Sequence, residues 1–286
     1  MMEVRTVGVV GCGLMGSAIA EVSLRAGYHV MVAEIDSVLL EKGLAGVRKS
    51  FDRDVGRGKL SEDEARAILD RLSSTTDLED FQGCDLVIEA APEKINIKKH
   101  IFTELHRYCP RHTILATNTS CLSVGEIAAT TDRPDRVLGI HFFNPVQLMR
   151  LVELVRTGST SEETLEAARA YVEKLGKTAV ISPDTPGFIV NRLLTPFLLE
   201  AMRLLQSGEV TKEDLDRAVR LGLNHPMGPL ALGDYIGLDT CLSICEAMYA
   251  QFKEERFKPP EMLSKMVDAG ETGRKSGRGF YEYPAA

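Results

Sequence analysis

The chain has 286 residues, of which 44% are hydrophobic, and a formal net charge of −7. This length and apolar content suit one large or two smaller globular domains, whereas the negative charge offers no attraction to nucleic acid or to an anionic membrane surface. No apolar run approaches the length of a transmembrane helix, and the N-terminus enters a strand at once, without the charged and apolar regions of a secretory leader. We therefore expect a soluble, cytoplasmic protein.

The six cysteines are far apart in the sequence, except for Cys241 and Cys245, whose spacing suits one face of a helix rather than a zinc site. This pattern is typical of reduced thiols in a cytosolic protein. We expect no disulfide and no metal. The six residues are Cys12, Cys84, Cys109, Cys121, Cys241 and Cys245.

The first predicted strand, Val7–Val10, leads directly into a glycine pattern of the form G-x-G-x-x-G. In this pattern the first glycine allows a tight turn, the second lets the backbone approach a pyrophosphate, and the third lets the next helix pack on the sheet. The helix, expected over Ser17–Ala26, offers N–H groups to phosphates at its N-terminus. The alternative is an ordinary strand-to-helix turn. The residues expected to contact a dinucleotide here are Gly11, Gly13, Leu14, Met15 and Gly16.

A second predicted strand, Val30–Ala33, ends at Glu34, where the dinucleotide pattern expects an acidic residue. A carboxylate at this point accepts hydrogen bonds from the adenosine ribose and repels a 2′-phosphate. It therefore favours NAD over NADP. Asp36 is the competing candidate, and a solvated carboxylate at a strand end is the alternative interpretation.

A helical excursion is predicted over residues 37–72. Its first helix is Ser37–Val55, and its second begins at a capping box formed by Ser61 and Glu64 and runs to about Leu72. The excursion either reaches towards a large ligand or forms a solvated helical hairpin.

Strands then alternate with helices, which predicts a parallel sheet with helices on both faces and ligands bound beyond the carboxyl ends of the strands. The expected strands are Leu86–Ala90, Thr113–Thr117, Val137–Ile140, Leu151–Val155 and Thr178–Ile181, and the expected helices are Ile95–Tyr108, Val124–Ala129 and Glu162–Leu175. Polar side chains follow three successive strands, namely Glu93 with Lys98, Asn118 to Ser120, and His141 with Asn144. Glu153 lies inside an apolar strand, either on a solvated face or buried and paired.

From Asp184 onwards the pattern is helical, so we expect a domain boundary there, with one domain at 1–184 and a second at 185–286. The run Phe188–Gln206 is apolar nearly all round, which predicts a buried helix and a subunit interface. The later helices are expected over Thr211–Leu221, Gly233–Gln251 and Glu261–Ala269.

End to end, the chain resembles the short-form L-3-hydroxyacyl-CoA dehydrogenases, and specifically the bacterial 3-hydroxybutyryl-CoA dehydrogenase group. The matching motifs are GCGLMG from Gly11, EAAPEK from Glu89, TNTSCLS from Thr117, GIHFFNPV from Gly139, LVELV from Leu151, DTPGFIVNR from Asp184, HPMGPLALGDYIGLD from His225 and KSGRGFYEY from Lys275. The resemblance implies a Rossmann-type NAD-binding domain followed by a helical substrate domain that forms a homodimer. It implies NAD-dependent oxidation of a 3-hydroxyacyl-CoA.

The resemblance also implies roles for individual residues. His141 and Glu153 match the catalytic pair, in which the imidazole takes the hydroxyl proton and the carboxylate orients it. Ser120 and Asn191 match positions at the reacting end of the substrate. The positions that contact NAD are Glu93, Lys98, Ser120, Asn144 and Lys275, and those near coenzyme A are Ser50, Arg57, Ser120 and Asn144.

Other functions stay open at this point. Cys121 stands where a second Ser is common, and in this feature the chain is similar to the gulonate dehydrogenases. Asn118 and the TNTS run argue against assigning the chain to that group. Substrates such as 3-hydroxyadipyl-CoA fit the same chemistry. The 3-hydroxyisobutyrate and 6-phosphogluconate dehydrogenases share a glycine loop but use a catalytic Lys after a glycine-rich run, which is not evident here. A non-catalytic, crystallin-like NAD-binding protein would lack the His or the Glu.

Overall fold

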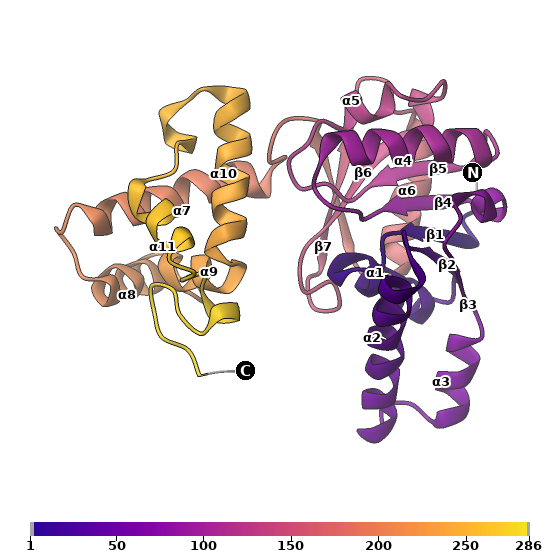
Figure 1. Ribbon diagram of the computed structural model, residues 1–286, viewed down its shortest axis with the longest axis horizontal. Helices are drawn as coiled ribbons and strands as arrows, with labels where there is room; N and C mark the ends of the chain where they lie inside the picture. Colours follow the sequence, from indigo (N-terminus) through magenta and orange to yellow (C-terminus); the bar gives the residue numbers. More distant parts are fainter. Residues whose placement is uncertain (1–2, 285–286) are drawn as a thin grey trace. The chain divides into compact units, whose positions relative to one another are not determined.

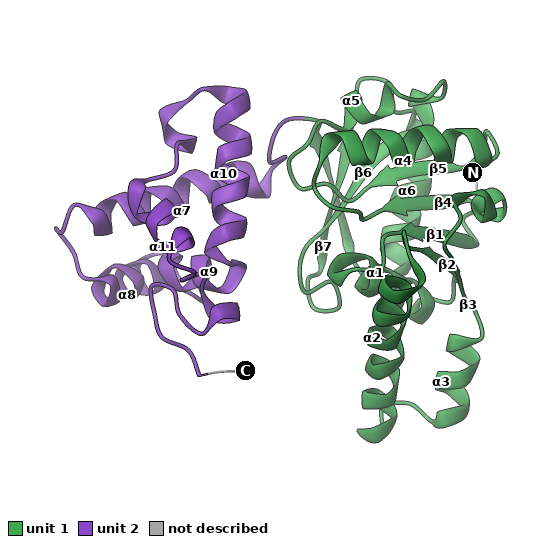
Figure 2. Cartoon of the chain, viewed as in Figure 1, with its two compact units in different colours: residues 1–184 green, residues 185–286 purple. Residues whose placement is uncertain are grey.

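The computed structural model describes residues 3–284, and the chain divides into two compact units, residues 1–184 and residues 185–286 (Figure 2). The first unit contains the sheet and the second is helical. Each unit has its own cluster of buried hydrophobic side chains.

The first unit is built on an eight-stranded sheet with the order β3-β2-β1-β4-β5-β6-β7-β8 (Figure 1). Its strands are β1 Thr6–Val10, β2 His29–Ala33, β3 Leu72–Thr75, β4 Leu86–Glu89, β5 Ile114–Thr117, β6 Val137–Phe142, β7 Leu151–Arg156 and β8 Thr178–Pro183. Its helices are α1 Leu14–Arg25, α2 Ser37–Gly56, α3 Glu62–Leu69, α4 Ile95–Tyr108, α5 Val124–Ala128 and α6 Glu162–Lys174, with 3₁₀ turns η1 Leu78–Gly83 and η2 Pro134–Arg136. The predicted α/β class, a Rossmann-type sheet with helices on both faces, is confirmed.

Two features of the sheet differ from the sequence prediction. The helical excursion ends at Leu69 rather than at about Leu72, and residues 72–75 add the edge strand β3 beside β2. Strand β7 runs antiparallel to β6. The connecting residues 143–150 are too few for the crossover of a dozen or more residues that a parallel neighbour needs, so the chain turns straight back.

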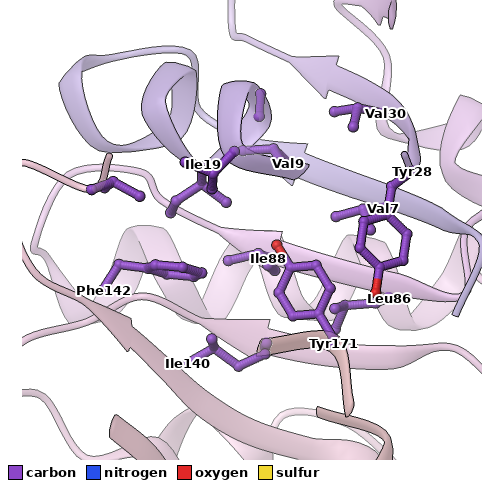
Figure 3. Packing of buried hydrophobic residues seen from close by; sticks show 14 of the residues in the cluster. Val7, Val9, Ile19, Tyr28, Val30, Leu86, Ile88, Ile140, Phe142 and Tyr171 are labelled. Atoms are coloured by element: carbon purple, nitrogen blue, oxygen red, sulfur yellow. The ribbon is translucent and has the colours of Figure 1, made fainter. Parts of the chain in front are cut away.

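One face of the sheet packs on α1 and α6 (Figure 3). Val7 and Val9 of β1 point to this face with Leu86 and Ile88 of β4, and Tyr171 of α6 closes the layer. The Tyr171 hydroxyl is within 2.8 Å of the Ser23 hydroxyl of α1, which satisfies two buried polar groups. Because side chains alternate along a strand, the intervening residues of each strand face the opposite side.

Helix α1 begins at Leu14, three residues earlier than the predicted Ser17. Gly13 is its N-cap in extended backbone, and the Ser17 hydroxyl donates to the Gly13 carbonyl at 2.7 Å. A Cβ on Gly16 would overlap the carbonyl oxygen of Gly11, and Gly11 itself has a φ of +97°. The turn therefore requires glycine at both positions.

The helices of the second unit are α7 Val190–Gln206, α8 Lys212–Gly222, α9 Pro229–Ile236, α10 Leu238–Phe252 and α11 Glu261–Asp268, with η3 Glu255–Phe257 and η4 Arg274–Ser276. The single helix predicted over Gly233–Gln251 is wrong. Gly237, with a φ of +102°, separates two helices there. Pro229 at the first turn sets the start of α9.

All six cysteines are free and buried. Burial raises the pKa of Cys12 and Cys109 to about 11, and that of Cys84, Cys121, Cys241 and Cys245 to about 12. Because the thiolate is the reactive form, we expect slow reaction of the folded protein with a thiol reagent at pH 8 and rapid reaction of six thiols after denaturation without reductant. A reproducible count of four in protein that was reduced and then desalted would contradict this prediction.

Candidate active site

His141 and Glu153 face each other across the antiparallel strands β6 and β7. The two residues are direct partners in the strand register, and His141 Nδ1 is 2.8 Å from Glu153 Oε2. Both side chains are almost fully buried, and the ring of Phe143 packs 4.5 Å from the imidazole. Strand β6 extends to Phe142, so His141 lies within the strand instead of following it as predicted. The buried and paired alternative for Glu153 is confirmed.

The polar residues of the candidate site share one face of the sheet. His141 and Glu153 alternate with the apolar residues that pack on α1 and α6, as do Glu89 of β4 and Thr117 of β5. Their side chains therefore lie on the opposite face, near the carboxyl ends of β4, β5 and β6. This is where a doubly wound sheet binds its ligands.

A buried network of charges lies at the carboxyl end of β4. The Lys98 ammonium, 1% exposed, is 2.7 Å from Glu89 Oε1 and 3.3 Å from Glu93 Oε2. Glu89 is fully buried and also accepts hydrogen bonds from the Ala91 N–H and the Thr117 hydroxyl. Sequence analysis did not single out Glu89, although a carboxylate inside a short apolar strand is a recognisable sign of a paired internal charge.

This network holds the segment that carries Ser120. Glu93 Oε1 accepts hydrogen bonds from the Thr119 hydroxyl at 2.6 Å and from the Ser120 N–H at 2.8 Å. Asn118 Oδ1 accepts from the N–H of Phe142, the residue after His141. The predicted polar clusters at the ends of β4, β5 and β6 are thus connected by hydrogen bonds within the first unit.

The glycine loop and the end of β2 border a cavity of about 290 Å³. Glu34 Oε2 accepts from the Cys12 N–H and Oε1 from the Ile35 N–H, both at 2.8 Å, which fixes the carboxylate at the rim. A Cβ on Gly13 would meet no other atom within 4 Å, so the backbone is open there. These residues fit the ribose and phosphates of a dinucleotide. The cavity is lined by Cys12, Gly13, Leu14, Ser17, Glu34, Leu39, Lys42, Gly43 and Gly46.

Other predicted site residues lie outside this cluster. Ser50, half-buried on α2, donates to Glu21 of α1, and Arg57 is exposed at the C-terminus of α2. Asn144 is exposed on the loop after β6. In the second unit, Asn191 is in the first turn of α7, and the Lys275 ammonium is 2.5 Å from an Asp239 carboxylate oxygen.

The fold and the site define a dinucleotide-binding protein with a buried His–Glu pair near the carboxyl ends of its parallel strands. Residues 6–185 match the family model described as 3-hydroxyacyl-CoA dehydrogenase, NAD binding domain, and residues 187–283 match 3-hydroxyacyl-CoA dehydrogenase, C-terminal domain. The chain belongs to the 3-hydroxyacyl-CoA dehydrogenase family.

Individual relatives agree with this assignment. The chain is 46% identical to a probable 3-hydroxybutyryl-CoA dehydrogenase of Bacillus subtilis, covering 99% of this chain and 98% of the relative. It is 48% identical to the 3-hydroxybutyryl-CoA dehydrogenase of Mycobacterium tuberculosis, covering 98% and 99%. The crystal structure of (S)-3-hydroxybutyryl-CoA dehydrogenase from Ralstonia eutropha superposes with a TM-score of 0.94 at 41% identity, covering 99% of this chain and 100% of that one.

Among residues 3–284, no helix has both the length and the apolar character needed to cross a membrane.

Proposed function

We propose that the protein oxidises a (3S)-3-hydroxyacyl-CoA, with 3-hydroxybutyryl-CoA as its main substrate, to the 3-oxoacyl-CoA and catalyses the reverse reaction. The observation that carries the proposal is the buried contact of 2.8 Å between His141 Nδ1 and Glu153 Oε2. The choice of 3-hydroxybutyryl-CoA as substrate rests on the names of relatives that match along nearly the whole chain. NAD, when bound, supplies the acceptor for the hydride that leaves C3.

In this proposal His141 is the general base. Its Nδ1 is held by Glu153, so Nε2 is the nitrogen that takes the proton from the 3-hydroxyl. The carboxylate fixes the tautomer and stabilises the imidazolium that forms, as the acid does in serine-protease triads. In the reverse direction the imidazolium returns the proton to the ketone oxygen.

The remaining site residues bind and orient. Ser120 and Asn191 hydrogen-bond the reacting end of the substrate, which aligns C3 with the nicotinamide. The glycine loop and Glu34 hold the pyrophosphate and adenosine ribose. The further residues of the NAD site are Glu93, Lys98, Ser120, Asn144 and Lys275, and those of the coenzyme A site are Ser50, Arg57, Ser120 and Asn144. Lys98 reaches the cofactor through Glu93, because its own ammonium is buried against carboxylates.

The direct assay is oxidation of NADH by the purified protein in the presence of acetoacetyl-CoA. We expect turnover and a (3S)-3-hydroxybutyryl-CoA product. A rate series over acyl length, with and without a terminal carboxylate, separates this substrate from 3-hydroxyadipyl-CoA. Turnover of gulonate, or of no 3-hydroxy acid, would contradict the proposal.

We expect NAD to be strongly preferred over NADP, because a 2′-phosphate would lie beside the fixed carboxylate of Glu34. Two charges about 4 Å apart repel by roughly 1 to 4 kcal/mol, so Glu34→Ser should narrow the ratio of kcat/KM values for the two cofactors about 10-fold or more. Asp36→Ser is the matched control, because a serine can still cap α2 as Asp36 does. Equal use of both cofactors by the unmodified protein would refute the prediction.

We further propose a cytoplasmic homodimer that associates through the second unit. Leu193 of α7 and Leu221 of α8 are 70% and 77% exposed in the single chain, so a partner that covered them would remove apolar surface from water. We expect light scattering at micromolar concentration to give twice the mass of one chain. The mass of a single chain would exclude the dimer.

A further inference from the structure

Glu21 is a buried carboxylate in the middle of α1, and the proposed reaction assigns it no role. Its side chain is 5% exposed. The Arg25 guanidinium donates to Oε1 at 2.9 Å, the Ser50 hydroxyl of α2 donates to the same oxygen at 2.7 Å, and the Gln147 amide donates to Oε2 at 2.7 Å. One carboxylate therefore joins α1, α2 and the loop of residues 143–150.

That loop connects His141 in β6 to Glu153 in β7 and carries Asn144. Its backbone is held from one side by the Lys177 ammonium, which donates to the carbonyls of Val146 and Met149 at 2.5 and 2.8 Å. Glu21 holds the loop by a side chain, through Gln147. Removing the Gln147 amide leaves an oxygen of a buried carboxylate without its donor, which is costly, so the loop has reason to stay on Glu21.

Ser50 supports the same carboxylate from α2. A hydroxyl donates one hydrogen bond at a time, and here that bond goes to Glu21. Arg25 completes the junction by pairing with Asp54 of α2 at 2.9 Å and by stacking 4.4 Å from the ring centroid of Phe51. The junction thus fixes α2 and the loop to the helix that follows the glycine loop.

We propose that Glu21 is a positioning residue for the dehydrogenase reaction. It holds the Asn144 loop through Gln147. Ser50 supports Glu21 and so helps to position this loop, in addition to its proposed contact with coenzyme A. The inference rests on the proposed function for its kinetic consequence. The placement of the loop itself does not depend on that function.

The kinetic test compares acetoacetyl-CoA with acetoacetyl-N-acetylcysteamine, a thioester that lacks the nucleotide and its phosphates. We expect Gln147→Leu and Ser50→Ala to lower kcat about threefold or more with both substrates, because small displacements of positioning groups reduce the chemical step. Arg57→Gln is the control, and it should affect the CoA thioester alone. If Ser50→Ala and Gln147→Leu left kcat for the truncated thioester unchanged, the proposal would be overturned.

Rescue distinguishes positioning from general loss of structure. Gln147→Glu places a second carboxylate against Glu21, and adding Glu21→Gln restores a donor and an acceptor. We expect the single Gln147→Glu variant to lose activity and the double variant to regain most of it. A double variant no more active than the single one would contradict the proposal.

Hydrogen exchange gives a readout that needs no turnover. We expect Glu21→Ala to speed amide exchange in a peptide covering residues 143–150, and Glu41→Ala, an exposed carboxylate on α2, to leave it unchanged. Unchanged exchange in Glu21→Ala would overturn the proposal. Absence of turnover by the unmodified protein would instead count against the proposed function.

Discussion

His141→Gln should fold, bind NADH normally and lose roughly 10²- to 10⁴-fold in kcat for acetoacetyl-CoA reduction, because glutamine of similar size cannot transfer the proton. The side chain is buried beside Glu153, and the amide can still occupy that space and accept or donate a hydrogen bond. The effect should therefore fall on the chemical step. Steady-state kinetics give the effect on kcat, and fluorescence titration gives the affinity for NADH, so the two measurements separate the chemical step from cofactor binding.

The competing explanation treats His141 as a buried core residue that is satisfied by Glu153. It predicts lower thermal stability of His141→Gln with near-normal kcat per folded molecule. Circular dichroism on the same preparation gives the folded fraction. A fully folded variant with near-normal kcat would mean that the proton leaves by another route.

Lys98→Ala should destabilise the first unit by about 3 to 5 kcal/mol, because it leaves Glu89 charged, buried and without its counter-ion. Glu93 would lose the same cation. We expect urea denaturation, followed by a probe within residues 1–184, to show this loss as a lower midpoint with a similar slope.

Lys99→Ala is a close control, one residue further along α4. Lys99 pairs with Glu126 at the surface, where such pairs contribute about 0 to 1 kcal/mol. Combining Lys98→Ala with Glu89→Gln should recover part of the stability, since the stranded charge is then absent. Equal losses of stability in Lys98→Ala and Lys99→Ala would show that the buried charge network contributes little to the free energy of unfolding.

Local sequence patterns predicted much of the fold. The periodicity of residues 95–108 matches α4 at both ends, and the Ser61–Glu64 pattern forms the capping box that starts α3. These features depend on residues a few positions apart. Strand β3 was missed because LSST has a weak apolar pattern and gains its structure from pairing with β2.

The arrangement of the site residues could be predicted less well from the sequence, because it depends on tertiary structure. The sequence predicts His141 at the end of one strand and marks Glu153 as unusual inside another, but only the antiparallel pairing of β6 with β7 places them opposite each other. The short connection at residues 143–150 was the available indication of that pairing. Glu89 and Glu21 remained undetected. The spacing of Glu21 and Arg25 suits an ordinary ion pair on one helix face, whereas Gln147, which binds Glu21, and Thr117, which binds Glu89, lie on other elements of the chain.

The most direct test of the His141–Glu153 mechanism is the kcat of the double variant His141→Gln, Glu153→Gln beside the two single variants, each corrected for its folded fraction. If Glu153 acts through the imidazole, it has nothing to orient once His141 is replaced, so the double variant should be about as slow as His141→Gln alone. Losses that multiply in the double variant would show that the two residues act independently, and the proposed pair would be wrong.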